Sequence, residues 1–219
     1  MTWLLFNSLV FILIFLIICN WFQLLRFLSI IIGPKYRTSS VDDKWIKSIV
    51  KKKTGLSLLD ITIFHDQKMY GMMVGFPFWP KMILSEGLYK SFNKDELEWV
   101  ILHEAGHCVL WHNLQAFLIE LLILGLGVYG INVFRLPLIL SLLLAIILSM
   151  ICIQLIRWGI EYIADLYSIN RVTNLKGVIT AQDKLRKANG EKGILILLFR
   201  WNISPTKRIE MAKQRMRKF

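Results

Sequence analysis

Long apolar runs with almost no charged residues alternate along the chain with amphipathic, mostly basic segments. The apolar runs cover residues 3–25, 116–133 and 136–156. Each is close to the roughly 20 residues that a helix needs to cross the hydrocarbon core of a bilayer. Only Arg135 and Pro137 mark the connection between the last two runs, which predicts a helical hairpin. The pattern predicts about three transmembrane helices, because buried core helices of this length and purity are unusual.

The polar segments show shorter periodic patterns. Residues 41–53 predict an amphipathic helix whose basic side faces either lipid headgroups or the rest of the domain. Residues 61–64 and 70–78 predict short strands joined by a hairpin turn at residues 65–68, and residues 81–85 predict a third strand. The expected fold class is an α+β membrane protein that is mostly helical, with a small β-sheet.

These patterns divide the chain into four parts. Residues 1–34 form an N-terminal transmembrane helix, and residues 114–156 form a transmembrane hairpin. The remaining parts, 35–113 and 157–219, are polar and expected to fold together outside the bilayer. Within the last part, the apolar residues 194–201 are a core strand or an interfacial segment.

Basic residues predict the orientation of the chain. Met1 and Thr2 precede the first span, whereas many lysines and arginines follow the first and third spans. By the positive-inside rule, the N-terminus lies outside and both polar parts lie in the cytoplasm. A multi-pass protein of the cell membrane is therefore expected.

The strongest chemical signal lies in a predicted helix that begins after Asn93. Asn93 is a favourable N-cap, and Glu96 stands three residues later as in a capping box. His103 and His107 are four residues apart, so their imidazoles share one helical face and can bind one metal ion. Glu104 follows the first histidine, where it can reach a water beside the metal. The alternative is an ordinary amphipathic helix with two surface histidines.

A third ligand is expected in Glu161, with Asp165 one turn further on. Glu161 follows directly on an apolar run, where an unpaired charge is costly, so a solvated acidic pair is the weaker alternative. Asp165 can accept the second ring N–H of a ligand histidine and fix its tautomer. On a continuing helix, His112 lies about 500° around from His107, off the ligand face. One zinc ion is expected, although histidine and carboxylate ligands also suit other divalent metals.

The paired motifs resemble a known family. His103-Glu104-x-Gly106-His107 followed by Glu161-x-x-Ala164-Asp165 is similar to the M48 family of integral-membrane zinc proteases, which includes the HtpX-type and the Ste24-type CAAX prenyl proteases. The segment Ser204-Pro205-Thr206-Lys207-Arg208-Ile209 resembles the C-terminal signature of that family. The short chain and few spans favour the HtpX type. The family's Asn-Ala motif is absent, and Tyr70-Gly71-Met72-Met73 occupies its place.

The resemblance implies a zincin-type catalytic domain that hydrolyses peptide bonds. Glu104 would act as general base, and Arg208 would stabilise the oxyanion or anchor the C-terminal lobe. The implied substrates are misfolded or unassembled membrane proteins. A CAAX-type prenyl protease and a non-catalytic zinc-binding membrane sensor or scaffold are the alternative functions.

The strand before the active-site helix is a candidate substrate-binding edge. Pro77 and Pro80 place its end at the edge of the sheet. An extended peptide could then add to it by β-augmentation. The residues expected to pair with substrate are Met72, Met73, Val74 and Gly75.

Composition and a few single residues add further expectations about the environment of the chain. Hydrophobic residues make up 55% of the chain and mean hydropathy is +0.52, above the usual range for soluble domains. The net charge of +12 follows from the topology and suits anionic lipid, and no nucleic-acid-binding motif accompanies it. Cys19, Cys108 and Cys152 are expected to be buried, reduced thiols. Glu120 lies inside the second span, where it is either functional or reaches the interface.

Overall fold

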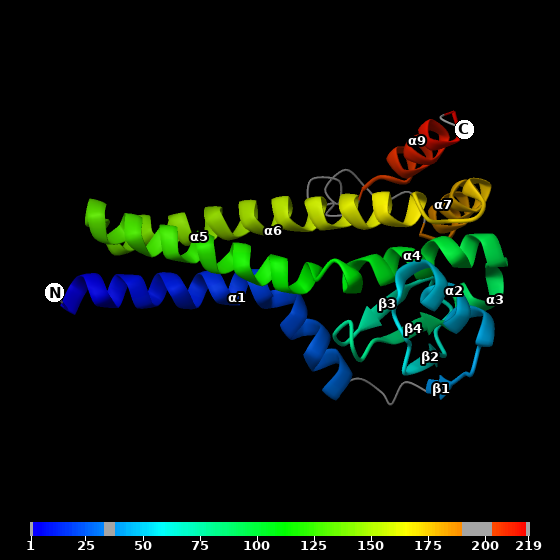
Figure 1. Ribbon diagram of the computed structural model, residues 1–219. Helices are drawn as coiled ribbons and strands as arrows, with labels where there is room; N and C mark the ends of the chain where they lie inside the picture. Colours follow the sequence, from blue (N-terminus) through cyan, green and yellow to red (C-terminus); the bar gives the residue numbers. More distant parts are fainter. Residues whose placement is uncertain (1, 33–37, 190–202, 218–219) are drawn as a thin grey trace. The chain divides into compact units, whose positions relative to one another are not determined.

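The computed structural model describes residues 2–32, 38–189 and 203–217 (Figure 1). The predicted segment 194–201 lies outside the described residues. In chain order the elements are α1 (Thr2–Ile32), β1 (Thr38–Ser40), α2 (Lys44–Thr54), β2 (Asp60–Phe64), β3 (Gly71–Val74), β4 (Lys81–Ser85), α3 (Glu86–Ser91), α4 (Lys94–Val109), α5 (His112–Phe134), α6 (Leu138–Ile169), α7 (Leu175–Asn189) and α9 (Pro205–Met216).

The elements group into two compact units. The apolar unit comprises Met1–Lys35 and Leu114–Arg157, and the mixed unit comprises Tyr36–Asn113 and Trp158–Phe219. Each unit is therefore assembled from two separate stretches of chain. The mostly helical content and the small sheet confirm the predicted α+β class.

The apolar unit contains α1, α5 and the first part of α6. Among the described residues, α5 and α6 are long and apolar enough to cross a membrane, and only 11% and 33% of their most apolar windows are buried. Apolar helices this exposed need lipid around them, which confirms an α+β membrane protein. The described apolar stretch of α1, Trp3–Cys19, is shorter, so a third span stays a prediction.

Contacts within the apolar unit hold α1 against the hairpin. A side chain at Gly127 of α5 would lie 2.2 Å from Cζ of Phe11, so the ring packs where only glycine leaves space. Asn7 donates a hydrogen bond to the carbonyl of Leu136 at 3.0 Å. Small residues and side-chain hydrogen bonds are the usual means of packing helices in membranes.

The sheet in the described part of the mixed unit has the strand order β1-β2-β4-β3. β2 pairs in parallel with β4, and β3 pairs with β4 in antiparallel fashion. The prediction that residues 61–64 and 70–78 pair as a hairpin is therefore wrong. Residues 65–68 lack the Asn-Gly or Gly-rich turn that a tight hairpin needs. Instead, the N–H of Gly87 donates to the carbonyl of Asp66 and ties this loop to α3.

Burial explains why β4 is central and β3 lies at the edge. Met82 and Leu84 of β4 are fully buried beside Ile61 of β2. β3 is an edge strand, as predicted, but it ends at Val74 rather than Phe78. Gly75 takes a φ of +95° and turns the chain out of the sheet.

Helices α2 and α7 pack on α4. The capping box of Asn93 and Glu96 begins α4 as predicted. Ile46 and Val50 of α2 are buried in the shared core, so its apolar side packs on the domain. Lys184 of α7 donates to the buried Glu96 carboxylate at 2.7 Å. α4 is thus fixed from several sides before any ligand binds.

The close approach of α7 to α4 gives a stability prediction. A Cβ at Gly177 would lie 2.6 Å from the backbone of Asp95, so Gly177→Ala should force the helices apart and cost about 1–3 kcal/mol. Gly159→Ala is the matched control, because nothing lies within 4 Å of its Cβ position. Thermal unfolding in detergent should show a lower Tm for Gly177→Ala only; equal Tm values would contradict this packing.

Candidate active site

Three side chains from two helices converge in the mixed unit. α4 supplies His103 and His107, and α6 supplies Glu161; one ligand atom from each lies within 4.8 Å of the others. The two Nε2 atoms are 3.3 Å apart, and Glu161 oxygens lie 3.4 Å from His103 and 3.6 Å from His107. Ligand atoms around a tetrahedral zinc with bonds near 2.0–2.1 Å are about 3.3 Å apart. The donor set therefore fits a single metal ion in type and spacing.

Asp165 lies behind His103. It follows Glu161 by four residues on α6, so both carboxylates share a helical face. Its Oδ1 is 2.9 Å from Nδ1 of His103, an ion-pair distance whose angle falls short of a regular hydrogen bond. This contact leaves Nε2 of His103 directed at Glu161 and His107.

Arg208 binds both carboxylates. Its Nε donates to Asp165 at 2.6 Å and an Nη donates to Glu161 at 3.1 Å. Ser204 caps the N-terminus of α9, and Pro205 starts it, which places Arg208 one turn into the helix. The guanidinium thereby ties α9 to α6.

Glu104 faces the edge strand. The backbone N–H of Met73 donates to its carboxylate, and a side chain at Gly71 would contact its Cγ at 3.7 Å. Burial raises the pKa of Glu104 to about 7, while the charge of His103 opposes the rise. β3 therefore positions this carboxylate beside the histidines.

Charge in the cluster is strongly coupled. Burial lowers the pKa of His103, but Asp165 and Glu161 outweigh it and raise the pKa to about 10. Burial and the charge of His103 lower the pKa of His107 to about 3. Glu161 stands beyond the apolar stretch of α6; burial favours its neutral form, yet His103, His107 and Arg208 lower its pKa to about 2. A divalent cation would bind an ionised Glu161 and take the place of the proton on His103.

His112 lies at a helix end and outside the three-residue cluster, but it contacts His107, which the sequence did not predict. α4 ends at Val109, Trp111 takes a left-handed φ of 54°, and α5 begins at His112. Because the helix breaks, His112 turns back and its Nδ1 lies 3.0 Å from Nδ1 of His107. The change from mixed to apolar sequence near residue 114 was the available signal for this break. His112 is buried and contacts a candidate ligand from behind.

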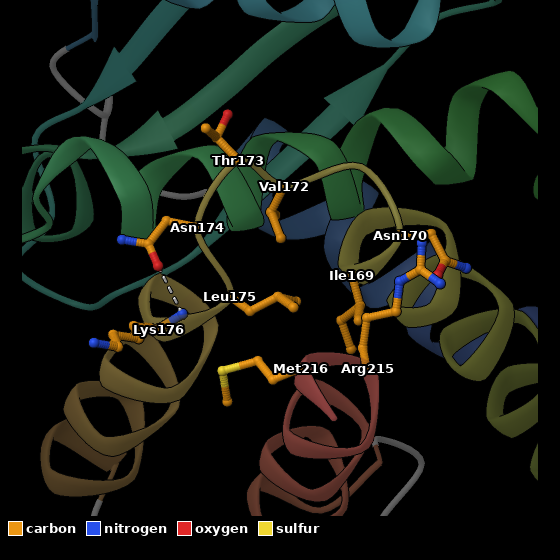
Figure 2. A pocket seen from close by; sticks show the side chains of 9 residues that line it. All are labelled: Ile169, Asn170, Val172, Thr173, Asn174, Leu175, Lys176, Arg215 and Met216. Carbon is orange, nitrogen blue, oxygen red and sulfur yellow. Dashed lines mark hydrogen bonds between the residues drawn. The ribbon is translucent and has the colours of Figure 1, made fainter. Parts of the chain in front are cut away.

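A separate cavity of about 370 Å³ lies among α7, α9 and the loop after α6. Figure 2 shows its lining side chains, Lys176 and Arg215 among them, with the N–H of Lys176 donating to the side chain of Asn174. None of its lining residues belongs to the His-His-Glu cluster. It is distinct from the candidate metal centre.

The converging side chains, the adjacent glutamate and the long apolar helices are the arrangement expected of a membrane metalloprotease. The chain belongs to peptidase family M48, whose model matches residues 40–189. This match confirms the resemblance, and it does not separate the HtpX type from the Ste24 type.

A solved structure shares the fold. The chain is similar to Ste24p of S. mikatae, with 18% sequence identity and a TM-score of 0.60 over 95% of this chain. It spans 56% of the Ste24p chain. No curated protein matches the chain by sequence.

The contact of His112 gives a prediction on metal affinity. If Nε2 of His107 binds the metal, its Nδ1 carries the proton and donates to His112. His112→Ala should then weaken zinc binding by about 10–100-fold, the usual effect of losing such a partner. Asn113→Ala, at the exposed neighbouring position, is the control. Competition with a zinc chelator measures the affinity, and an unchanged value for His112→Ala would show that the contact has no orienting role.

Proposed function

We propose that the chain is a zinc-dependent endopeptidase in which His103, His107 and Glu161 hold one zinc ion. The observation that carries the proposal is the convergence of the two histidine Nε2 atoms, 3.3 Å apart, with the Glu161 carboxylate, whose Oε2 is 3.4 Å from His103 and whose Oε1 is 3.6 Å from His107. These distances are close to the edge of a zinc tetrahedron. When bound, zinc supplies Lewis-acid polarisation of the scissile carbonyl and activation of a water.

Glu104 is the proposed general base. It takes the proton of the attacking water and passes it to the leaving amine. A pKa near 7 suits a group that must accept and return a proton at neutral pH. The hydrogen bond from Met73 N–H orients the carboxylate for both steps.

Asp165 and Arg208 position the ligands. The Asp165 carboxylate, 2.9 Å from Nδ1 of His103, would keep the proton on Nδ1 and so leave the Nε2 lone pair for the metal. Both donors of Arg208 that have partners bind carboxylates, which supports the anchoring role over the oxyanion role.

β3 is the proposed substrate-binding edge. Ser85 N–H donates to Tyr70 C=O, so residues 70 and 85 form a hydrogen-bonded pair. In an antiparallel ladder such pairs alternate, so Met72 and Val74 turn their backbone groups toward β4 while Gly71 and Met73 turn theirs to the open edge. An extended peptide would pair there with the backbone groups of Gly71 and the carbonyl of Met73, next to Glu104.

The proposed substrates are misfolded membrane proteins in the manner of HtpX-type proteases. The site would face the cytoplasm, with the N-terminus outside, because basic residues are concentrated after the first and third spans. The two spans of α5 and α6 would return the chain to the side on which α4 lies. The likeness to Ste24p keeps a CAAX-type prenyl protease as the second candidate. A prenylated peptide cleaved faster than an unprenylated one would favour that candidate.

Metal analysis paired with proteolysis tests the proposal. The wild type and Glu104→Gln should each hold about one zinc, and Glu161→Ala should lose it. Casein cleavage should fall by about 10²–10⁴-fold in Glu104→Gln, because the base is removed. Glu210→Gln, on the exposed side of α9, is the control and should cleave normally. Zinc without cleavage in the wild type would favour the sensor or scaffold, and absence of zinc would contradict the site.

The role of β3 has its own test. Met73→Pro removes the N–H that binds Glu104 and blocks pairing at the open edge, so cleavage should be abolished while zinc stays bound. Met73→Ala keeps the backbone donor and should retain most activity. Zinc content and Tm show whether each variant is folded. Normal cleavage by a folded Met73→Pro variant would rule out substrate pairing with β3.

A further inference from the structure

Four aromatic side chains form an exposed cluster in the mixed unit. Phe76 and Phe78 are each 57% exposed, Trp79 is 63% exposed and Trp111 is 41% exposed. We call them the aromatic patch. The rings form a continuous set, with centroids 5.4 Å apart for Phe76 and Phe78 and 4.9 Å apart for Phe78 and Trp79. Contiguous apolar surface of this kind marks a binding site for a protein or a membrane.

The turn that carries three of these rings is rigid. Gly75 has a φ of +95°, and a Cβ there would lie 2.3 Å from the carbonyl oxygen of Trp79. The N–H of Trp79 donates to the carbonyl of Phe76 at 2.8 Å and closes the turn. Pro77 and Pro80 restrict the backbone further. The rings are therefore held outward by the backbone.

Trp111 places the patch relative to the bilayer. It directly precedes α5, and the part of α5 that belongs to the apolar unit begins at Leu114. Trp111 is therefore about one helical turn along the chain from a candidate membrane span. Trp158 stands at the matching point of α6, 51% exposed, with its ring stacked on Tyr162 at 5.5 Å. Tryptophans at both ends of a hairpin are typical of the membrane–water interface.

The aromatic turn contacts Trp111 directly. The rings of Phe76 and Phe78 lie 6.3 and 6.4 Å from the ring of Trp111. Lys81, just beyond the turn, is exposed and suits an anionic headgroup. We propose that the aromatic patch inserts into the interfacial layer of the bilayer and holds the open edge of β3 at the membrane surface. This docking needs neither zinc nor peptide cleavage.

Lipid quenching of a single label tests the proposal. Cys19, Cys108 and Cys152 are buried, so a thiol-reactive fluorophore should label mainly an introduced cysteine, with the wild type as blank. Full-length Phe78→Cys and Trp79→Cys are labelled and reconstituted into phosphatidylcholine–phosphatidylglycerol vesicles. Gln67→Cys is the matched control, because it is exposed at the opposite end of β3. Nitroxide lipids then report contact with lipid, and iodide reports contact with water.

The expected result is several-fold stronger quenching by nitroxide lipid, and weaker quenching by iodide, at positions 78 and 79 than at position 67. Equal iodide quenching at all three positions would overturn the proposal. Shielding that disappears when the protein is diluted in excess lipid would assign the patch to a second copy of the chain. Shielding that needs added casein would assign it to substrate. Either of these results would also overturn lipid docking.

Discussion

The buried carboxylate of Asp165 joins the three helices on which the site depends. Asp165 lies on α6, contacts His103 of α4 and accepts a hydrogen bond from Arg208 of α9. A fully buried charge is tolerated only when it is paired, and loss of one partner typically costs about 3–5 kcal/mol. The interaction that aims His103 is therefore also the one that packs the helices. Geometry at the metal ligands and stability of the mixed unit cannot be separated.

Helix periodicity was enough to predict the ligand cluster. His103 and His107 lie on one uninterrupted helix, and Glu161 and Asp165 lie on another, so spacing by four fixed each pair. The resemblance of both motifs to those of family M48 then suggested that the two helices meet. The same arithmetic failed for His112, because Trp111 breaks the helix and no glycine or proline announces the break.

Strand pairing was harder to predict than helix faces. Strands β2, β3 and β4 were predicted near their observed positions, helped in β2 and β4 by buried residues at alternate positions, whereas the short β1 was not predicted. The order of the strands in the sheet was not predicted. β2 and β4 are neighbours in the sheet although β3 lies between them in the sequence, and local sequence carries little information on such pairing. The edge position of β3 was predicted from its flanking prolines. Its early end at Val74 depends on the turn at Gly75, which the sequence analysis had included in the strand.

The mixed unit is split in the chain, with the hairpin of α5 and α6 between its two halves. His103, Glu104 and His107 are synthesised first, whereas Glu161, Asp165 and Arg208 follow only after both hairpin helices. A nascent chain thus carries only two of the three candidate ligands until the end of α6 has been synthesised. The split order delays assembly of the candidate site until both hairpin helices have been synthesised, so the site and the apolar unit are completed together.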